Sequence, residues 1–301
     1  MISMEELCEQ IRERQRQMQK GFDARTPIGE SLEIPWEGHL PVKVLVNVPA
    51  NKPDGKVPYF INAHGGGYIE GDAITMGTFC QKLADALGIV VMNINYRLSP
   101  DYLFGYQVDE VKVLRQYVKE NQDALGIDPS RCGIGGFSAG ASLAISCVVR
   151  SIQNAEDPFK CCVLGYPVTT MMPGSIDPNH PYPAGDETMM KAMNYYCQGQ
   201  EEDPALSPLI AEDSLLKQFP ATILITCGKD VLSEQGRAFG ARLVNCGVKV
   251  NFEEYKDAFH GFIEVNRPDY FWEDPRKNPE QQALNDKAEQ WIIDGLSAML
   301  F

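Results

Sequence analysis

The sequence is short of positive charge and has no long hydrophobic run. Its 301 residues carry 27 Lys and Arg against 41 Asp and Glu, a formal net charge of −14. Such a surface repels phosphate backbones and anionic headgroups, so we expect neither a nucleic-acid nor a membrane partner. No segment approaches the ~18 consecutive apolar residues of a membrane-spanning helix, and the first residues lack the apolar centre of a signal peptide. We therefore expect a cytoplasmic protein.

Signatures of metal and nucleotide binding are also missing. The nine cysteines include no Cys-x-x-Cys pair, and their odd number argues against a disulfide framework. The sequence has no G-x-x-x-x-G-K-[ST] motif, and the nearest approach to a dinucleotide-binding glycine loop, residues 133–138, ends on the wrong residue type. We therefore expect reduced thiols in the core, and no metal or organic cofactor.

Short apolar runs alternate with helical patterns along most of the chain. Runs typical of strands, several of them apolar throughout, lie at residues 42–48, 57–62, 89–95, 131–135, 160–164, 221–227 and 248–255. Helical spacing follows at residues 75–87, 106–121, 139–150, 231–246 and 283–299. This alternation predicts an α/β fold with a mostly parallel central sheet flanked by helices.

Two stretches depart from that alternation. Residues 4–20 are charged and Gln-rich with apolar residues at helical spacing, which predicts an amphipathic helix outside the main domain. Residues 168–215 are rich in proline and methionine and include a predicted helix at 187–198. An insertion of this length above a sheet is typical of a lid, although methionines also fill irregular gaps in a core.

The strongest chemical signal is Gly136-Phe-Ser-Ala-Gly140, which follows a predicted strand and opens a predicted helix. A strand that turns abruptly into a helix needs small residues on both sides of the turn, and it leaves the central Ser138 exposed. The helix starting at Ala139 points free N–H groups at any negative oxygen formed there. A glycine-rich turn with an incidental serine is the alternative, and the strand and helix on either side disfavour it.

A second glycine-rich loop, His64-Gly-Gly-Gly-Tyr68, directly follows the strand predicted at 57–62. Consecutive glycines are useful where the main chain must approach a ligand closely with its N–H groups pointing outward. An oxyanion hole has this requirement, and each donor is typically worth roughly 2.7–4 kcal/mol of transition-state stabilisation. We expect His64 itself to be a structural hydrogen-bonding residue.

A serine needs a base to take its proton, and the chain has only four histidines. His260 is the favoured base, because it lies in a loop soon after the strand predicted at 248–255. Asp230, just beyond the strand predicted at 221–227, is the favoured orienting acid; Asp257 and Glu234 are its rivals. The order of nucleophile, acid and base matches α/β-hydrolases and differs from chymotrypsin-like and subtilisin-like proteases.

From about residue 57 to 262 the sequence resembles the hormone-sensitive-lipase-like group of α/β-hydrolase esterases, also called bacterial family IV carboxylesterases. The resemblance rests on the two glycine motifs and on Asn95-Tyr-Arg-Leu-Ser-Pro100, Leu206-Ser-Pro-Leu209, Gly228-Lys-Asp230 and His260-Gly-Phe262. It implies that Ser138 is the nucleophile, His260 the base and Asp230 its orienter. It also implies an oxyanion hole formed by the backbone N–H groups of Gly66, Gly67 and Ala139.

The resemblance further implies a cap, which residues 1–40 and about 168–215 would build over a catalytic domain of residues 41–301, and it suggests a homodimer. The sequence departs from the group at Phe137, where an acidic residue is common. Phe137 and Tyr68 are our predicted substrate-binding side chains, although Phe137 would alternatively pack beneath the pocket. This departure leaves the three catalytic residues in place.

The resulting prediction is a serine carboxylesterase that hydrolyses short-chain, acetyl-like esters of small molecules through an acyl-enzyme. One alternative is a peptidase or amidase on the same fold. Another is a non-catalytic ligand-binding protein, since the same fold also serves receptors that keep the pocket and lose the chemistry.

Overall fold

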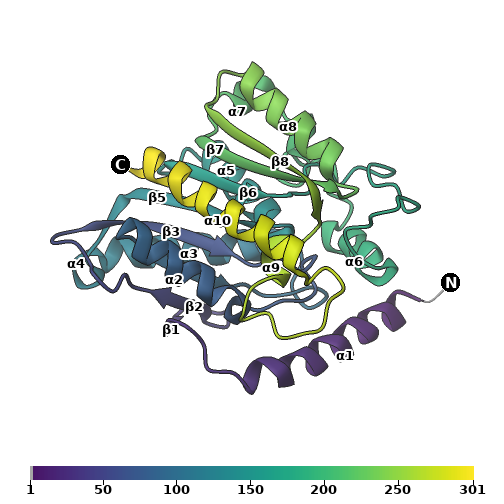
Figure 1. Cartoon of the computed structure of the whole chain (residues 1–301), viewed down its shortest axis with the longest axis horizontal. Helices are drawn as coiled ribbons and strands as arrows, with labels where there is room; N and C mark the ends of the chain where they lie inside the picture. The colour runs from purple at the N-terminus through teal and green to yellow at the C-terminus, as the bar shows by residue number, and fades with distance from the viewer. Residues whose placement is uncertain (1–2) are drawn as a thin grey trace.

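A single eight-stranded sheet forms the centre of the computed structural model, which describes residues 3–301 (Figure 1). Its strands are β1 (Glu30–Ile34), β2 (Val42–Asn47), β3 (Val57–Ala63), β4 (Val90–Asn95), β5 (Ile127–Phe137), β6 (Cys161–Gly165), β7 (Ala221–Lys229) and β8 (Val250–Phe259). Their order is β1-β2-β4-β3-β5-β6-β7-β8, with β2 antiparallel to both its neighbours and all other pairs parallel. The predicted mostly parallel sheet is confirmed.

Helices cover both faces of the sheet and build two apolar cores. On one face lie α2 (Gly77–Leu87) and α10 (Pro279–Leu300); on the other lie α3 (Tyr106–Glu120), α5 (Ala139–Gln153) and α8 (Ser233–Asn245). Figure 1 shows α2 and α10 crossing in front of the strands. All seven residues of β3 are buried, and each fully buried large apolar side chain contributes about 1.5–3 kcal/mol. Because helices bury the central strands on both faces, the ends of these strands are held in fixed positions.

Shorter elements connect these layers. They are two 3-10 turns, η1 (Ala73–Met76) and η2 (Pro208–Ile210), and the helices α4 (Gln122–Leu125), α6 (Glu187–Cys197), α7 (Asp213–Leu216) and α9 (Phe262–Val265). The helix predicted at 75–87 is therefore split between η1 and α2. The strand predicted at 248–255 starts at Val250 and continues to Phe259, which brings its end next to His260.

One strand was missed by the sequence prediction. Of the five residues of β1, only Ile34 is buried, so this edge strand shows little of the apolar pattern that identified the others. Its Leu32 packs against the core only partly buried. Edge strands of this kind are short and polar because exposed apolar edges pair with other chains.

The N-terminal helix α1 (Met4–Asp23) lies along the rim of the molecule, beside α6 (Figure 1). Ser3 and Glu6 form a reciprocal capping box at its start, and Leu7 and Ile11 are buried against the main core. The predicted amphipathic helix at 4–20 is thus present. Within residues 3–301, no helix combines the length and the hydropathy needed to cross a bilayer.

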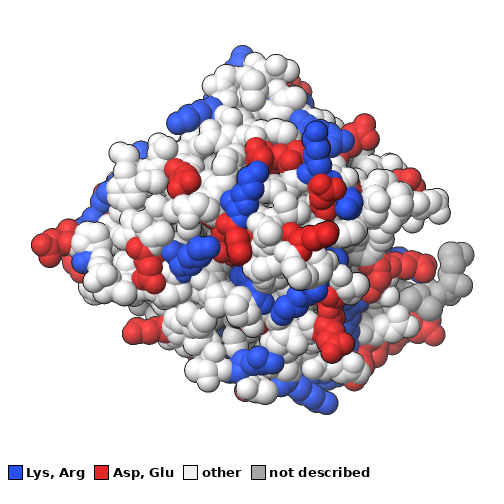
Figure 2. Space-filling view, in the orientation of Figure 1, with Lys and Arg blue, Asp and Glu red and all other residues white. Residues whose placement is uncertain are grey.

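Charges of both signs are mixed over the face shown in Figure 2, so the net negative charge is not gathered into one patch there. The nine cysteines are all free, and eight of them are buried. Cys246, at the end of α8, is the partly exposed one. The predicted reduced core thiols are therefore present as described.

Candidate active site

Three side chains meet at the carboxyl ends of strands β5, β7 and β8. Ser138 follows β5, Asp230 follows β7 and His260 follows β8, so the parallel sheet brings them to one edge. Ser138 Oγ lies 2.8 Å from His260 Nε2, and His260 Nδ1 lies 2.7 Å from Asp230 Oδ2. Asp230 and His260 are both buried. The geometry is that of a nucleophile, a base and an orienting carboxylate within hydrogen-bonding distance of one another.

The two rival carboxylates lie elsewhere. Asp257 is exposed, with its carboxylate 3.6 Å from Lys229 Nζ, and Glu234 is exposed on the first turn of α8. Asp230 is fixed by a second bond, because its Oδ1 accepts the backbone N–H of Leu232 at 2.9 Å. Of the three candidate acids, Asp230 alone holds the imidazole.

The serine sits on a strained turn between β5 and α5. Its φ is +52°, a backbone conformation that residues other than glycine rarely adopt. A Cβ on Gly136 would lie 2.2 Å from the carbonyl oxygen of Ala63, and one on Gly140 would lie 2.1 Å from the same oxygen. Glycines are therefore required on both sides of Ser138, as the motif predicts.

The glycine loop after β3 is packed as tightly. Gly66 has a φ of +115° and Gly67 a φ of +60°. A Cβ on Gly66 would lie 2.1 Å from the carbonyl oxygen of Glu70, and one on Gly67 would lie 2.6 Å from Met189 Cγ. Ala139 is the first residue of α5, so its N–H has no partner within the helix. Gly66 and Gly67 line the same cavity as Ser138, next to the first turn of α5.

His64 has the structural place expected for it. Its ring stacks on that of Tyr96 with centroids 4.2 Å apart, and its Nδ1 lies 2.7 Å from the carbonyl oxygen of Gly65. Tyr96 in turn donates its hydroxyl to the His64 carbonyl at 2.8 Å. Burial lowers the pKa of His64 below its ordinary value, which favours the neutral ring.

Residues that the sequence prediction missed hold the histidine loop. Arg276 donates from Nη1 to the carbonyl oxygen of His260 at 2.7 Å, and Asp274 binds the same guanidinium. Tyr166 packs edge-on against the His260 ring, with centroids 5.1 Å apart, and donates its hydroxyl to Glu264. Burial is the main cause that raises the pKa of Tyr166 well above its ordinary value, and the negative charge of Glu264 adds to it. The hydroxyl therefore keeps its proton.

Ser138 and His260 open into a cavity of about 120 Å³. Three distant chain segments wall it: α1, residues 184–189, and the loop between α9 and α10 at 266–278. They contribute the side chains of Met18, Ala184, Met189, Tyr270, Trp272 and Arg276. Figure 1 shows the 266–278 loop, in yellow-green, between α9 and α1. The sequence prediction included the first two segments and overlooked the third, although its Tyr270-Phe-Trp272 run was a signal.

Neither of the two predicted substrate-binding side chains lines this cavity, and Phe137 packs in the core, which was the alternative stated for it. Phe137 is fully buried in the core beneath α2 and α10, where its ring meets Phe79 edge-on at 5.3 Å. Tyr68 is 2% exposed and stacks on Tyr196, with centroids 4.0 Å apart. Phe137 is the last residue of β5, and its side chain points from the strand into the core, whereas Ser138 lies on the turn beyond the strand end.

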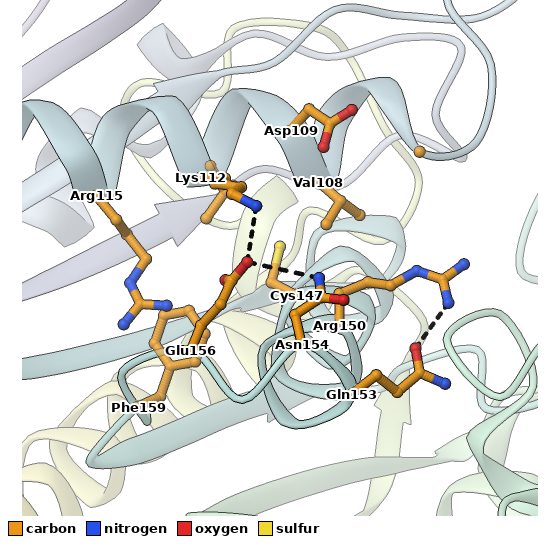
Figure 3. A pocket seen from close by; sticks show the side chains of 12 residues that line it. Val108, Asp109, Lys112, Arg115, Cys147, Arg150, Gln153, Asn154, Glu156 and Phe159 are labelled. Atoms are coloured by element: carbon orange, nitrogen blue, oxygen red, sulfur yellow. Dashed lines mark hydrogen bonds and ion pairs between the residues drawn. The ribbon is translucent and has the colours of Figure 1, made fainter.

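A larger hollow of about 390 Å³ lies between α3 and α5, with Cys147 among its lining residues (Figure 3). Most of its charged groups are already paired with each other or with the chain. Lys112 binds Glu156 at 2.8 Å, and Arg150 donates to Gln153 at 2.7 Å and also to Asp203. Arg115 lies over the Phe159 ring at 4.1 Å. None of its lining residues belongs to the triad or the glycine loops.

Metal ligands do not cluster in the described part of the chain. Residues 3–301 contain no group of three or more His, Cys, Asp or Glu side chains placed to hold a metal ion.

Comparison with known proteins agrees with the fold and the motifs. Residues 60–264 match the family described as alpha/beta hydrolase fold. The chain is 28% identical to arylacetamide deacetylase of Oryctolagus cuniculus over 294 residues, covering 76% of this chain and 73% of that protein. It is 27% identical to versiconal hemiacetal acetate esterase of Dothistroma septosporum, covering 79% and 74%.

Among solved structures, the Pyrobaculum calidifontis esterase superposes with a TM-score of 0.76 at 24% identity, covering 99% of this chain and 94% of that one. At this identity the likeness concerns the fold. The family match spans well over half of the chain and includes both glycine motifs and the positions of Ser138, Asp230 and His260. The chain belongs to the α/β-hydrolase fold family, in its hormone-sensitive-lipase-like group of carboxylesterases.

Proposed function

We propose that this ester hydrolase works through Ser138 and an acyl-enzyme, and that its substrates are short-chain, acetyl-like esters of small molecules. The observation that carries the mechanism is the chain of contacts from Ser138 Oγ through His260 to Asp230, at 2.8 and 2.7 Å. A hydroxyl this close to a buried imidazole transfers its proton as it attacks a carbonyl carbon.

In the first half-reaction Ser138 Oγ bonds to the ester carbon and His260 Nε2 takes the serine proton. The carbonyl oxygen becomes an oxyanion, which the N–H groups of Gly66, Gly67 and Ala139 stabilise. The bond to the alcohol oxygen then breaks, and His260 returns the proton to the leaving alcohol. In the second half-reaction a water molecule attacks the acyl-enzyme with His260 again as base, and the carboxylic acid is released.

The size of the cavity supports short acyl groups. Its volume of about 120 Å³ is less than a third of that of the hollow between α3 and α5, which is about 390 Å³. Met18, Met189 and Trp272 close its apolar sides. One relative is named for an acetate ester, and the other for deacetylation. A panel of p-nitrophenyl esters from acetyl to dodecanoyl tests the proposal, because equal rates across the panel would contradict it.

The deciding experiment for the mechanism is covalent labelling. A fluorophosphonate probe should modify the wild-type protein at one mole per mole, at Ser138, and should leave Ser138→Ala unmodified. Ser138→Ala should also lose hydrolysis of p-nitrophenyl acetate by several orders of magnitude. A folded Ser138→Ala protein that still hydrolyses the ester at the wild-type rate would overturn the mechanism.

The name of one relative, arylacetamide deacetylase, favours a second candidate activity on amides. Amide cleavage requires protonation of a poorer leaving group by the same histidine. Measuring p-nitrophenyl acetate and p-nitroacetanilide side by side separates the two activities. A non-catalytic binding role is tested by the same labelling experiment, since such a protein would not react with the probe.

We also propose that residues 1–40, of which 1 and 2 lie outside the described residues, and the insertion at about 168–215 act as the cap of a catalytic domain of residues 41–301. Both segments contribute side chains to the cavity wall. The homodimer and the cytoplasmic location stay predictions; sedimentation at several protein concentrations would test the dimer.

A further inference from the structure

Arg14, on the N-terminal helix α1, links three segments at the mouth of the cavity. Its Nη2 lies 2.5 Å from Glu70 Oε2, and its Nη1 lies 2.6 Å from Asp186 Oδ2. Glu70 belongs to the glycine loop that follows β3, and Asp186 is the N-cap residue of α6. One guanidinium therefore joins the N-terminal helix to the candidate oxyanion loop and to the insertion.

The first connection reaches the oxyanion loop through Glu70. The backbone N–H of Glu70 donates to the carbonyl oxygen of Gly66 at 3.0 Å, and the two residues pack so closely that Gly66 tolerates no Cβ. The Glu70 side chain lines the cavity and is only 17% exposed. Burial raises the pKa of this carboxyl above its ordinary value, although Arg14 opposes the rise. Without Arg14, this charge would lie half-desolvated beside the loop.

The second connection reaches the same loop from above. Asp186 accepts the backbone N–H of Met189 at 2.8 Å, which fixes the first turn of α6. Met189 lies over Gly67, close enough that a Cβ on Gly67 would collide with it. Arg14 thus acts on Gly66 through Glu70 and on Gly67 through Asp186 and Met189.

Other contacts hold α1 in place independently of Arg14. Gln15 donates from Nε2 to the carbonyl oxygens of Ile69 and Ser99, both at 2.7 Å. Leu7 and Ile11 are buried, and Phe22 meets the Trp272 ring edge-on at 4.9 Å. Removal of Arg14 should therefore leave the helix docked and release only the link to the loop.

We propose that Arg14 is a positioning residue for the oxyanion hole, which holds the N–H groups of Gly66 and Gly67 in place by pairing with Glu70 and Asp186. The inference rests on the proposed serine mechanism. Arg14 is absent from the cavity lining, so it acts through its two carboxylate partners and not by contact with substrate. A donor displaced from the developing oxyanion weakens transition-state binding more than substrate binding, so kcat is the quantity that should fall.

The test compares Arg14→Ala with Arg12→Ala, a matched control on the same helix. Arg12 and Arg14 have similar side-chain exposure, 39% and 36%, but Arg12 pairs with Glu9 and Asp101, away from the cavity lining. Arg14→Ala should lower kcat for p-nitrophenyl acetate about tenfold and change KM less than threefold. Arg14→Lys should recover part of the loss, and Arg12→Ala should match the wild type.

Two further readouts separate positioning from a structural role. Adding Glu70→Gln to Arg14→Ala should raise kcat again, because the neutral amide needs no counter-charge. The ratio of acetate to butyrate hydrolysis should stay constant in Arg14→Ala, whereas a change in the cavity wall would shift it. Wild-type kcat in Arg14→Ala, or an equal loss in Arg12→Ala, would overturn the inference.

Failure of the inference is distinguishable from failure of the proposed mechanism. If the fluorophosphonate labels Ser138 in the wild type but Arg14→Ala behaves like Arg12→Ala, only the role of Arg14 is lost. If Ser138 is not labelled at all, the serine mechanism fails before Arg14 is considered.

Discussion

The inside of the site and its cover are held together by different forces. Ser138 and Asp230 follow the mostly buried strands β5 and β7, and His260 follows the edge strand β8. Gly66, Gly136 and Gly140 lie too close to backbone carbonyls to accept a Cβ. The cover consists of α1, residues 184–189 and the 266–278 loop, joined by ion pairs, aromatic edges and methionines. Backbone packing permits few alternatives, whereas flexible side-chain contacts can rearrange. Substitutions inside the site should therefore change the rate of hydrolysis, and substitutions in the cover should change which esters are accepted.

The largest expected effect is inside the site. Asp230→Asn should lower kcat for p-nitrophenyl acetate about 10⁴-fold, because the amide no longer stabilises the protonated imidazole or selects its tautomer. Asp257→Asn, the exposed rival carboxylate three residues before His260, should leave kcat unchanged. Steady-state kinetics on both variants measures this, and equal losses would mean that the acid has been misassigned.

A pair of glycines tests the contrast in packing directly. Gly140→Ala would place a Cβ 2.1 Å from the Ala63 carbonyl oxygen, so the serine turn must shift. We expect the free energy of unfolding to fall by about 3 kcal/mol and kcat to fall ~100-fold or more. Gly185→Ala would meet the flexible Met189 Sδ at 2.4 Å and should cost far less. Urea unfolding and kinetics compare the two, and similar stability losses would contradict the distinction.

Stability of the main domain should depend on pH through Glu110. Burial raises the pKa of this α3 carboxyl to about 7, although the Arg97 backbone N–H, which it accepts at 2.8 Å, opposes the rise. Below about pH 4.5 the carboxyl is protonated in both states. Between about pH 4.5 and pH 7 the unfolded chain releases this proton, whereas the folded protein keeps it. The free energy of unfolding should therefore fall by about 3 kcal/mol as the pH rises through this range. Glu110→Gln should remove this dependence of stability on pH. If urea titrations gave the same pH profile for Glu110→Gln and the wild type, Glu110 would not be its source.

The smallest expected effect concerns the cover. Trp272→Ala should enlarge the cavity and raise kcat/KM for the hexanoyl ester relative to the acetyl ester about tenfold, with no change in labelling of Ser138. Trp36→Ala is the control, because Trp36 stacks on His39 and is not among the cavity-lining residues. An unchanged chain-length profile in Trp272→Ala would show that this loop does not limit the acyl group.

The same contrast explains which parts could be predicted from the sequence. The ends of β5 and β7, which lead to Ser138 and Asp230, are mostly apolar and buried, and glycines at 136 and 140 are imposed by backbone contacts. Both features leave a local pattern in the chain. The ion pair between Arg14 and Asp186 joins residues 172 positions apart, and nothing nearby in the sequence selects one carboxylate among many. Strand β1 was missed because it is exposed. The two placements considered for Phe137 could not be separated, because a motif position alone does not say which way a side chain points.

The shared contacts of Ala63 with Gly136 and Gly140 have a consequence for behaviour at high temperature. The carbonyl at the end of β3 lies so close to both sides of the serine turn that neither glycine has room for a Cβ, so we expect the nucleophile and this strand to move as one rigid unit. Warming should loosen the peripheral helix and the aromatic loop before this unit, since local opening begins where contacts are fewest and most exposed. Just below its melting transition the enzyme should accept bulkier esters while still turning them over, and become promiscuous before it becomes inactive.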